Sequence, residues 1–181
     1  MKKLYFILFG VTLLLLTLSL AGCLEGDKKT DLLSGLSYKN NTYGFGFNPP
    51  EGWTTDTSIP GVIVSFIGPT INNSAINIVV TAGQLEPGET LYSACTQMID
   101  SFPNIFTNYS FISRQNLTIN NMSSHEIVIV HDQGITTIKQ REVLIEKNGK
   151  ALVLTFTAIP DEFDTYNLVF GESLNSVKII W

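Results

Sequence analysis

The chain has 181 residues, of which 44% are hydrophobic and only 15% are charged, whereas soluble domains carry about 25% charged residues. Its 16 acidic and 11 basic residues give a formal net charge of −5. Proteins that bind nucleic acid depend on clustered Lys and Arg, so this balance argues against a nucleic-acid partner.

The N-terminus has the pattern of a secretory signal peptide. Lys2 and Lys3 precede residues 4–22, which carry no charge. The segment Leu20–Cys23 (Leu-Ala-Gly-Cys) resembles the lipobox of bacterial-type lipoproteins, in which small residues precede a lipid-modified cysteine. We therefore predict a signal peptide at 1–22 and lipidation at Cys23, which tethers the protein to the extracytoplasmic side of the cell membrane. The alternative is an uncleaved anchor, because about 19 apolar residues approach the length of a membrane span.

The predicted mature chain consists of a linker and one domain. Removal of residues 1–22 leaves 159 residues, with 16 acidic and 9 basic side chains, about the size of one domain. The cysteine and the polar segment that follows it, 23–35, are predicted to form a flexible linker of at most about 40 Å. The predicted domain then covers residues 36–181.

The first half of the domain is predicted to contain strands and one helix. Residues 38–48 alternate aromatic side chains with glycine and predict a strand with bulk on one face and close approach on the other. Trp53 follows a Pro-Pro-Glu-Gly bend and is expected to be substantially buried. Residues 62–67 and 76–82 predict a hairpin. Residues 90–102 predict an amphipathic helix, and Cys95 lies on its apolar face, which indicates a core residue rather than a nucleophile.

The second half predicts a strand meander and a second helix. Four β-rich segments are separated by turn residues, and Asn148-Gly149 indicates a type I′ hairpin turn. Pro160 opens a helix with an acidic first turn. The order of strands, helix, strands and helix predicts an antiparallel sheet with helices packed on it. The four predicted strands are residues 111–118, 124–131, 136–146 and 151–159.

The segment Tyr43–Trp53 (Tyr-Gly-Phe-Gly-Phe-Asn-Pro-Pro-Glu-Gly-Trp) resembles the opening of PsbP-like domains, in which an aromatic strand runs into a Pro-x-Gly-Trp turn. The order of the later elements is similar as well, so the resemblance covers residues 36–181. It implies an α+β fold, an α/β/α sandwich around a central antiparallel sheet of about six or seven strands. The functions of this fold family diverge widely, so the resemblance carries no binding residue onto this chain.

Five Asn-x-Ser/Thr triplets are candidate acceptors for N-glycosylation in an exported protein. They begin at Asn40, Asn72, Asn108, Asn116 and Asn121.

Several partial motifs do not support catalysis. His125-Glu126 begins like a zinc-protease motif, but Ile129 stands where the second histidine belongs. His131 shares a strand face with His125 about 20 Å away, too far to share a metal. Two further partial motifs have structural interpretations: Ser173 is expected to be a helix-surface hydroxyl, and Asp161, Glu162 and Asp164 are expected to cap a helix.

These observations favour a non-catalytic, lipid-anchored domain that binds a protein or cell-surface partner and uses no cofactor. The alternative is a small-ligand or metal-binding surface protein associated with a transporter, with a pocket near Trp53 and the aromatic strand. A hydrolase is the third hypothesis.

Overall fold

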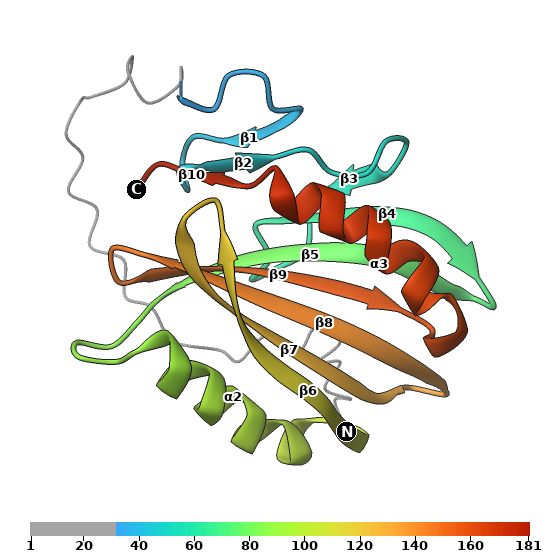
Figure 1. Cartoon of the computed structure of the whole chain (residues 1–181). Coiled ribbons are helices and arrows are strands. Elements are labelled where there is room, and N and C mark those ends of the chain that lie inside the picture. Colours follow the sequence, from blue (N-terminus) through green and yellow to red (C-terminus); the bar gives the residue numbers. More distant parts are fainter. Residues whose placement is uncertain (1–31) are drawn as a thin grey trace, which may run out of the picture.

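The computed structural model describes residues 32–181, and its main element is a seven-stranded antiparallel sheet. The strand order is β3-β4-β5-β9-β8-β7-β6, so β3 and β6 form the two edges (Figure 1). The seven strands are β3 (Thr54–Asp56), β4 (Val64–Ile71), β5 (Ser74–Gln84), β6 (Thr107–Ile119), β7 (Met122–Gln133), β8 (Thr136–Lys147) and β9 (Lys150–Ala158).

A second, small sheet joins the two ends of the domain. It has the order β1-β2-β10 and consists of β1 (Tyr38–Asn40), β2 (Phe45–Phe47) and β10 (Lys178–Ile179). Gly46 pairs with Lys39 on one side and Lys178 on the other. A Cβ atom at Gly46 would lie 2.7 Å from the Tyr38 carbonyl oxygen, so the close approach predicted for the glycine face is confirmed.

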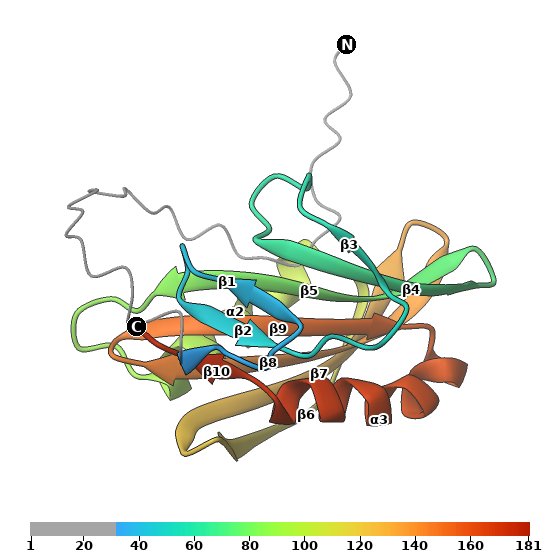
Figure 2. The same cartoon turned by 90° about the horizontal axis from the view of Figure 1, so that it is seen from above.

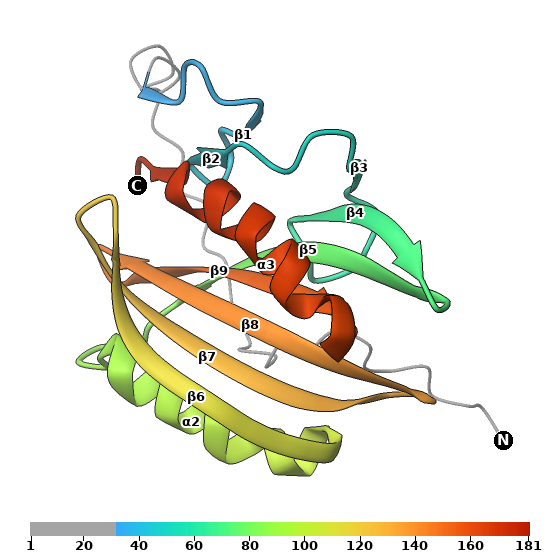
Figure 3. The same ribbon diagram turned by 45° about the vertical axis from the view of Figure 1, so that its right-hand side comes forward.

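Two helices cover opposite faces of the large sheet. The first, α2 (Leu91–Ile105), lies under the half of the sheet that contains β6 and β7, and the second, α3 (Pro160–Asn175), lies over β8 and β9 on the other face (Figures 1 and 3). The small sheet lies on the same face as α3, as the view from above shows (Figure 2). No helix within residues 32–181 is long and apolar enough to cross a membrane.

The larger apolar core lies between α3, the small sheet and the large sheet. Phe45 and Phe47 of β2 are fully buried there, together with Phe156 of β9 and Phe170 of α3. The rings of Phe156 and Phe170 stack with centroids 5.4 Å apart. The alternation of apolar residues along β9 produces this packing, because every second side chain points to the α3 face.

The predicted antiparallel sheet and the Asn-Gly hairpin turn are confirmed. Asn148 and Gly149 have φ angles of 53° and 74°, as a type I′ turn requires. The single strand predicted at residues 38–48 is wrong, because the chain turns there between β1 and β2. The Tyr43 amide donates to the Asn40 side-chain oxygen at 2.9 Å, and Tyr43 itself is exposed.

Two boundaries also differ from the sequence prediction. The first helix continues past residue 102 to Ile105, with Pro103 in its last turn. Leu33, which lies within the predicted linker, is fully buried.

Candidate functional site

Four exposed apolar side chains lie toward one end of the large sheet, near the end of α2, in the first half of β6 and in the β7–β8 turn. Phe111 pairs with Ile129, six residues before Ile135, so the four residues are spread over about 20 Å. The exposed fractions are 38% for Ile105, 46% for Phe111, 52% for Ile112 and 106% for Ile135. Thr107 of β6 pairs with Asp132 of β7, so the first residues of β6 lie next to the β7–β8 turn. The same end is visible at the lower right of Figures 1 and 3. We call these four residues the apolar corner.

Two irregularities in β6 shape this corner. The register with β7 shifts between Thr107 and Ser110 and again between Phe111 and Ser113. Each shift adds one residue to β6, as in a β-bulge, and a bulge redirects side chains. Ile112 has no partner in the register and is exposed. The corner therefore depends on a bulged strand rather than on regular alternation.

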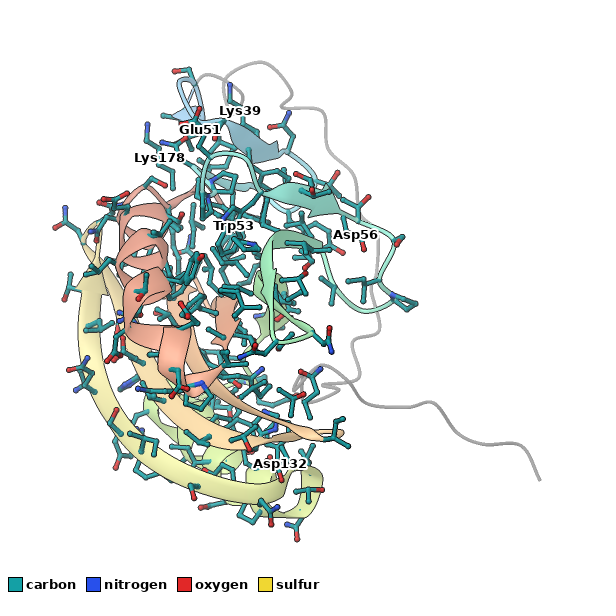
Figure 4. The ribbon with its side chains drawn as sticks, turned by 90° about the vertical axis from the view of Figure 1, so that its right-hand side faces the viewer. Lys39, Glu51, Trp53, Asp56, Asp132 and Lys178 are labelled. Atoms are coloured by element: carbon teal, nitrogen blue, oxygen red, sulfur yellow. The ribbon has the colours of Figure 1, made fainter. Side chains whose placement is uncertain are left out.

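A carboxylate ties the bulged strand to the neighbouring hairpin. Asn108, with a φ of 51°, donates from its side-chain amide to Asp132 at 2.5 Å, and the Thr137 hydroxyl donates to the same carboxylate at 2.7 Å. The hydrogen bonds from Thr137 and Asn108 hold the pKa of Asp132 below its usual value. Figure 4 places Asp132 beside the start of β6, far from Lys39 and Lys178 of the small sheet.

An aromatic layer supports the corner from inside. The ring of Phe106, which follows α2, stacks on His131 with centroids 3.9 Å apart. The His131 ring is fixed by hydrogen-bond contacts with the Gln140 side chain at 2.9 Å and the Asp132 carbonyl at 3.1 Å. His131 is thus a buried histidine with both ring nitrogens in hydrogen-bond contact.

Under α2, the sheet carries buried polar groups instead of a uniform apolar face. Glu142 is 1% exposed, and burial raises its pKa to about 8. One Glu142 oxygen, the Tyr109 hydroxyl and His125 Nδ1 are buried and have no hydrogen-bond partner among residues 32–181. Burial also raises the pKa of the nearby Cys95 thiol to about 12, which suits a core residue and disfavours a nucleophile.

The two residues of the partial zinc-protease motif lie on opposite faces of β7. His125 is buried on the α2 side with its ring against Tyr92, at a centroid distance of 5.9 Å. Glu126 forms an ion pair with Arg141 and accepts from Gln115 at 2.6 Å. Adjacent strand residues point apart, so this pair does not converge on one metal. Within residues 32–181, no three His, Cys, Asp or Glu side chains form a metal cluster.

The other residues singled out from the sequence have structural contacts. The predicted acidic first turn of α3 is confirmed for Asp161 and Glu162, but the N-cap residue is Ile159 and no side chain makes a cap hydrogen bond there, so the predicted capping is not formed. Asp164 lies 3.7 Å from the Lys139 ammonium group. Ser173 is 2% exposed, so the prediction of a surface hydroxyl is wrong. Its position on α3 faces the sheet together with Phe170 and Leu174.

The aromatic strand and Trp53 contribute to the core. Phe45 and Phe47 are fully buried, and half-buried Trp53 packs against the same apolar core. The Trp53 ring covers Gly68 so closely that a Cβ atom there would lie 2.5 Å from it. Nothing in this packing favours the alternative hypothesis of a ligand pocket near Trp53.

The five candidate glycosylation sites differ in whether the asparagine side chain makes a hydrogen bond. Asn40 and Asn108 donate from their side-chain amides to Tyr38 and Asp132. The side chains of Asn72, Asn116 and Asn121 are exposed and make no hydrogen bond within the part of the chain that the structure describes. The predicted lipidation site, Cys23, lies outside the described residues.

Sequence reasoning missed the apolar corner. The apolar residue Ile135 after Gly134 in a turn was a visible signal, but the exposure of Phe111 and Ile112 depends on bulges that the residue types do not reveal. Both residues fit an ordinary strand pattern when the sequence is considered alone.

A family model described as DcrB matches residues 46–167 of this chain. Similar solved structures include the cyanobacterial PsbP (CyanoP) of Synechocystis sp. PCC 6803, with 15% identity, a TM-score of 0.60 and coverage of 79% of this chain and 91% of that one. LpqN of Mycobacterium tuberculosis, described as involved in cell envelope biogenesis, has 15% identity, a TM-score of 0.54 and coverages of 76% and 83%. The Ran-binding protein Mog1p of Saccharomyces cerevisiae has 7% identity, a TM-score of 0.56 and coverages of 78% and 93%.

These likenesses confirm the PsbP-like α+β fold expected from the sequence. No curated protein has a significantly similar sequence.

Proposed function

The chain belongs to the DcrB family, and from this premise we propose that it is a non-catalytic envelope protein that is anchored to the membrane by a lipid at Cys23 and binds a partner protein through the apolar corner. The observation that carries the binding proposal is the exposure of Ile105, Phe111, Ile112 and Ile135 toward one end of the sheet.

The anchor proposal is supported by the sequence. The lipobox-like segment Leu20–Cys23 follows an uncharged stretch, and a polar linker separates it from the domain. LpqN, a structural neighbour, is described as acting in envelope biogenesis in its own organism, which is compatible with an envelope location here. A diacylglyceryl group at Cys23 would hold the domain at the extracytoplasmic surface of the membrane.

The apolar corner suits a protein partner better than a small ligand. Large apolar side chains exposed on one part of a surface mark interaction sites, and these four belong to α2, β6 and the β7–β8 turn. The partner surface is therefore expected to be apolar.

The absence of catalysis remains part of the proposal. Its support is that the titratable side chains near the corner already have structural roles: Asp132 holds the bulge, and His131 stacks under Phe106. Neither side chain is left to act as a base or a nucleophile.

The binding proposal is tested by site-specific photo-crosslinking in cells. A benzophenone side chain at Ile112 and, separately, at Ile135 should crosslink to the same protein. The matched control is Leu168 on α3, which is also apolar and is 74% exposed. Ile135→Asp should reduce crosslinking from position 112 about tenfold. Equal products from all three positions, or none from the corner, would contradict binding at this surface.

The anchor is tested independently by mass spectrometry of the N-terminal peptide from the native protein. The expected species begins at Cys23 and carries a thioether-linked lipid. Cys23→Ser should abolish the modification. An unmodified Cys23 still joined to Gly22 would refute the lipoprotein proposal and favour a transmembrane anchor.

A further inference from the structure

The edge strand β6 has two halves with different properties. The half that contains the bulges carries Phe111 and Ile112 of the apolar corner. The other half, residues 113–119, pairs with β7 without interruption from Ser113 to Ile119, and no strand within the described residues 32–181 pairs with its outer side. We call this half the regular edge.

The regular edge has few of the features that keep free strands from pairing with other chains. Natural edges are protected by short length, lysine, proline, inward-pointing charges or bulges. The opposite edge strand, β3, has only three residues. The regular edge has seven residues in register, and its sequence (Ser-Arg-Gln-Asn-Leu-Thr-Ile) contains one charge, at Arg114.

That single charge is held against α2. Arg114 donates to the Thr96 hydroxyl at 2.9 Å and to the Tyr92 carbonyl at 2.8 Å, and its guanidinium group lies 3.8 Å from the centre of the Tyr92 ring. A charge fixed in this way on the face of the sheet does not project from the free edge. The main-chain groups of the regular edge are therefore open to a second strand.

A candidate acceptor for a glycan lies in the middle of this edge. Asn116 is exposed, its side chain makes no hydrogen bond to any described residue, and Thr118, two residues later, is also exposed. Both residues occur in the Asn-Leu-Thr triplet that the glycosylation reaction requires. The other two triplets with unbonded asparagines begin in turns, at Asn72 and Asn121, where both residues have positive φ angles.

We propose that Asn116 carries an N-linked glycan that covers the regular edge of β6 and keeps it from pairing with other strands, while the apolar corner stays open for the partner. This inference rests on the proposed extracytoplasmic location, because the modification needs export. Two copies meeting at an uncovered edge could pair antiparallel about Asn116, which would place Arg114 opposite Thr118 of the second copy and bring no like charges face to face.

The modification is a glycosyl transfer from a polyprenyl-phosphate-linked or polyprenyl-pyrophosphate-linked oligosaccharide. The Asn116 amide nitrogen forms a bond to the anomeric carbon and loses one proton, and the anomeric carbon–oxygen bond to the phosphate breaks. The lipid phosphate or pyrophosphate is the leaving group, so no oxidant or reductant takes part.

The first test is mass spectrometry of glycopeptides from the full-length protein purified from its own cells. The peptide that contains Asn116 should carry a glycan, and Thr118→Ala should remove it. An unmodified Asn116 in protein that carries a lipid at Cys23 would overturn this inference and leave the proposed anchor intact. An unmodified Cys23 in protein that carries a glycan at Asn116 would overturn the proposed anchor and leave this inference intact.

The second test measures self-association by sedimentation velocity. Asn116→Gln, which lacks the glycan, should associate at least about tenfold more tightly than the native protein, whereas Asn72→Gln should behave as the native protein does. Asn116→Lys also lacks the glycan but places a charge on the edge, so it should remain monomeric. If Asn116→Gln is as monomeric as the native glycoprotein, the glycan does not protect this edge and the inference is wrong.

Discussion

The two faces of the seven-stranded sheet are covered in different ways. On the α3 face, the larger apolar cluster includes the stacked rings of Phe156 and Phe170, and the buried carboxylate on this face, Glu126, is paired with Arg141. On the α2 face, a smaller apolar cluster surrounds Glu142, His125 and Tyr109, and each of these has a buried polar atom without a hydrogen-bond partner. A buried unpaired polar atom opposes folding by about 1–3 kcal/mol.

The difference indicates that the α3 face supplies most of the stability and that α2 is the less firmly held layer. The apolar corner is built where α2 joins β6, so the proposed binding site lies on the weaker layer. Substitutions on the α3 face should therefore mainly reduce stability, whereas substitutions at the apolar corner should mainly reduce binding of the partner.

The largest effect is expected from Phe156→Ala on the α3 face. The Phe156 ring contacts Phe163 and Phe170, with centroids 5.3 and 5.4 Å away. Its removal should lower the free energy of unfolding by about 3–5 kcal/mol, measured by urea denaturation. Leu168→Ala, at an exposed position of α3, should change it by less than about 0.5 kcal/mol. A loss below about 1 kcal/mol for Phe156→Ala would remove the basis for the comparison.

A smaller loss, about 3 kcal/mol, is expected for Trp53→Ala, because the side chain is only half-buried at the margin of the α3-face core. Gly68→Ala should also destabilise the protein, since its Cβ would lie 2.5 Å from the Trp53 ring. The penalty should largely disappear when both substitutions are combined. Equal penalties in the two backgrounds would show that the ring does not cover Gly68 in solution.

On the α2 face, stability should depend on the ionisation of Glu142. Burial raises the pKa of Glu142 to about 8 from an ordinary value of 4.5, so the folded state binds the proton more tightly than the unfolded state. The stabilisation is complete below the ordinary pKa and is lost as pH rises through the folded pKa. The groups nearby on the surrounding elements are Cys95 on α2, Tyr109 and Arg114 on β6, and His125 on β7.

The expected result is a decrease of about 1 kcal/mol in the free energy of unfolding between pH 7 and 8, and no such decrease for Glu142→Gln. The range between pH 7 and 8 avoids the titration of His125. Burial and Arg114 lower the pKa of His125, so its ionisation reduces the free energy of unfolding only as the pH falls below its ordinary value of 6.5. Glu172→Gln, at an exposed position on α3, is the control and should keep the pH dependence. The same slope in Glu142→Gln would assign the effect to another group.

The contrast between the faces also explains which features the sequence predicts. The α3 face follows from residue patterns, because Leu152, Leu154 and Phe156 alternate along β9 and Pro160 opens the covering helix. The α2 face does not follow in this way. Glu142 and His125 are polar residues in strands, and residue type alone places such side chains on the solvent face.

The apolar corner could not be predicted from the sequence for a related reason. Phe111 and Ile112 are exposed because β6 is bulged and lies at an edge, and both facts depend on which strand pairs with it. Pairing is set by long-range packing rather than by local propensity. The fold was predictable because a resemblance supplied that long-range order, whereas no matching segment supplied a binding surface.

The smallest effect is expected from a matched pair of hydroxyl deletions, one on each face. The Tyr109 hydroxyl is buried without a partner under α2, so Tyr109→Phe removes a desolvated group and should leave the free energy of unfolding unchanged or raise it by up to about 1 kcal/mol. The Tyr38 hydroxyl accepts a hydrogen bond from Asn40 at 3.3 Å near the α3-face core, so Tyr38→Phe should lower the free energy of unfolding by about 0.5–1 kcal/mol. Each substitution keeps the ring, and the two therefore compare the same atom in the two layers. A clear loss of stability in Tyr109→Phe would mean that its hydroxyl has a partner, such as an ordered water between α2 and the sheet, and that the α2 layer is as well satisfied as the other.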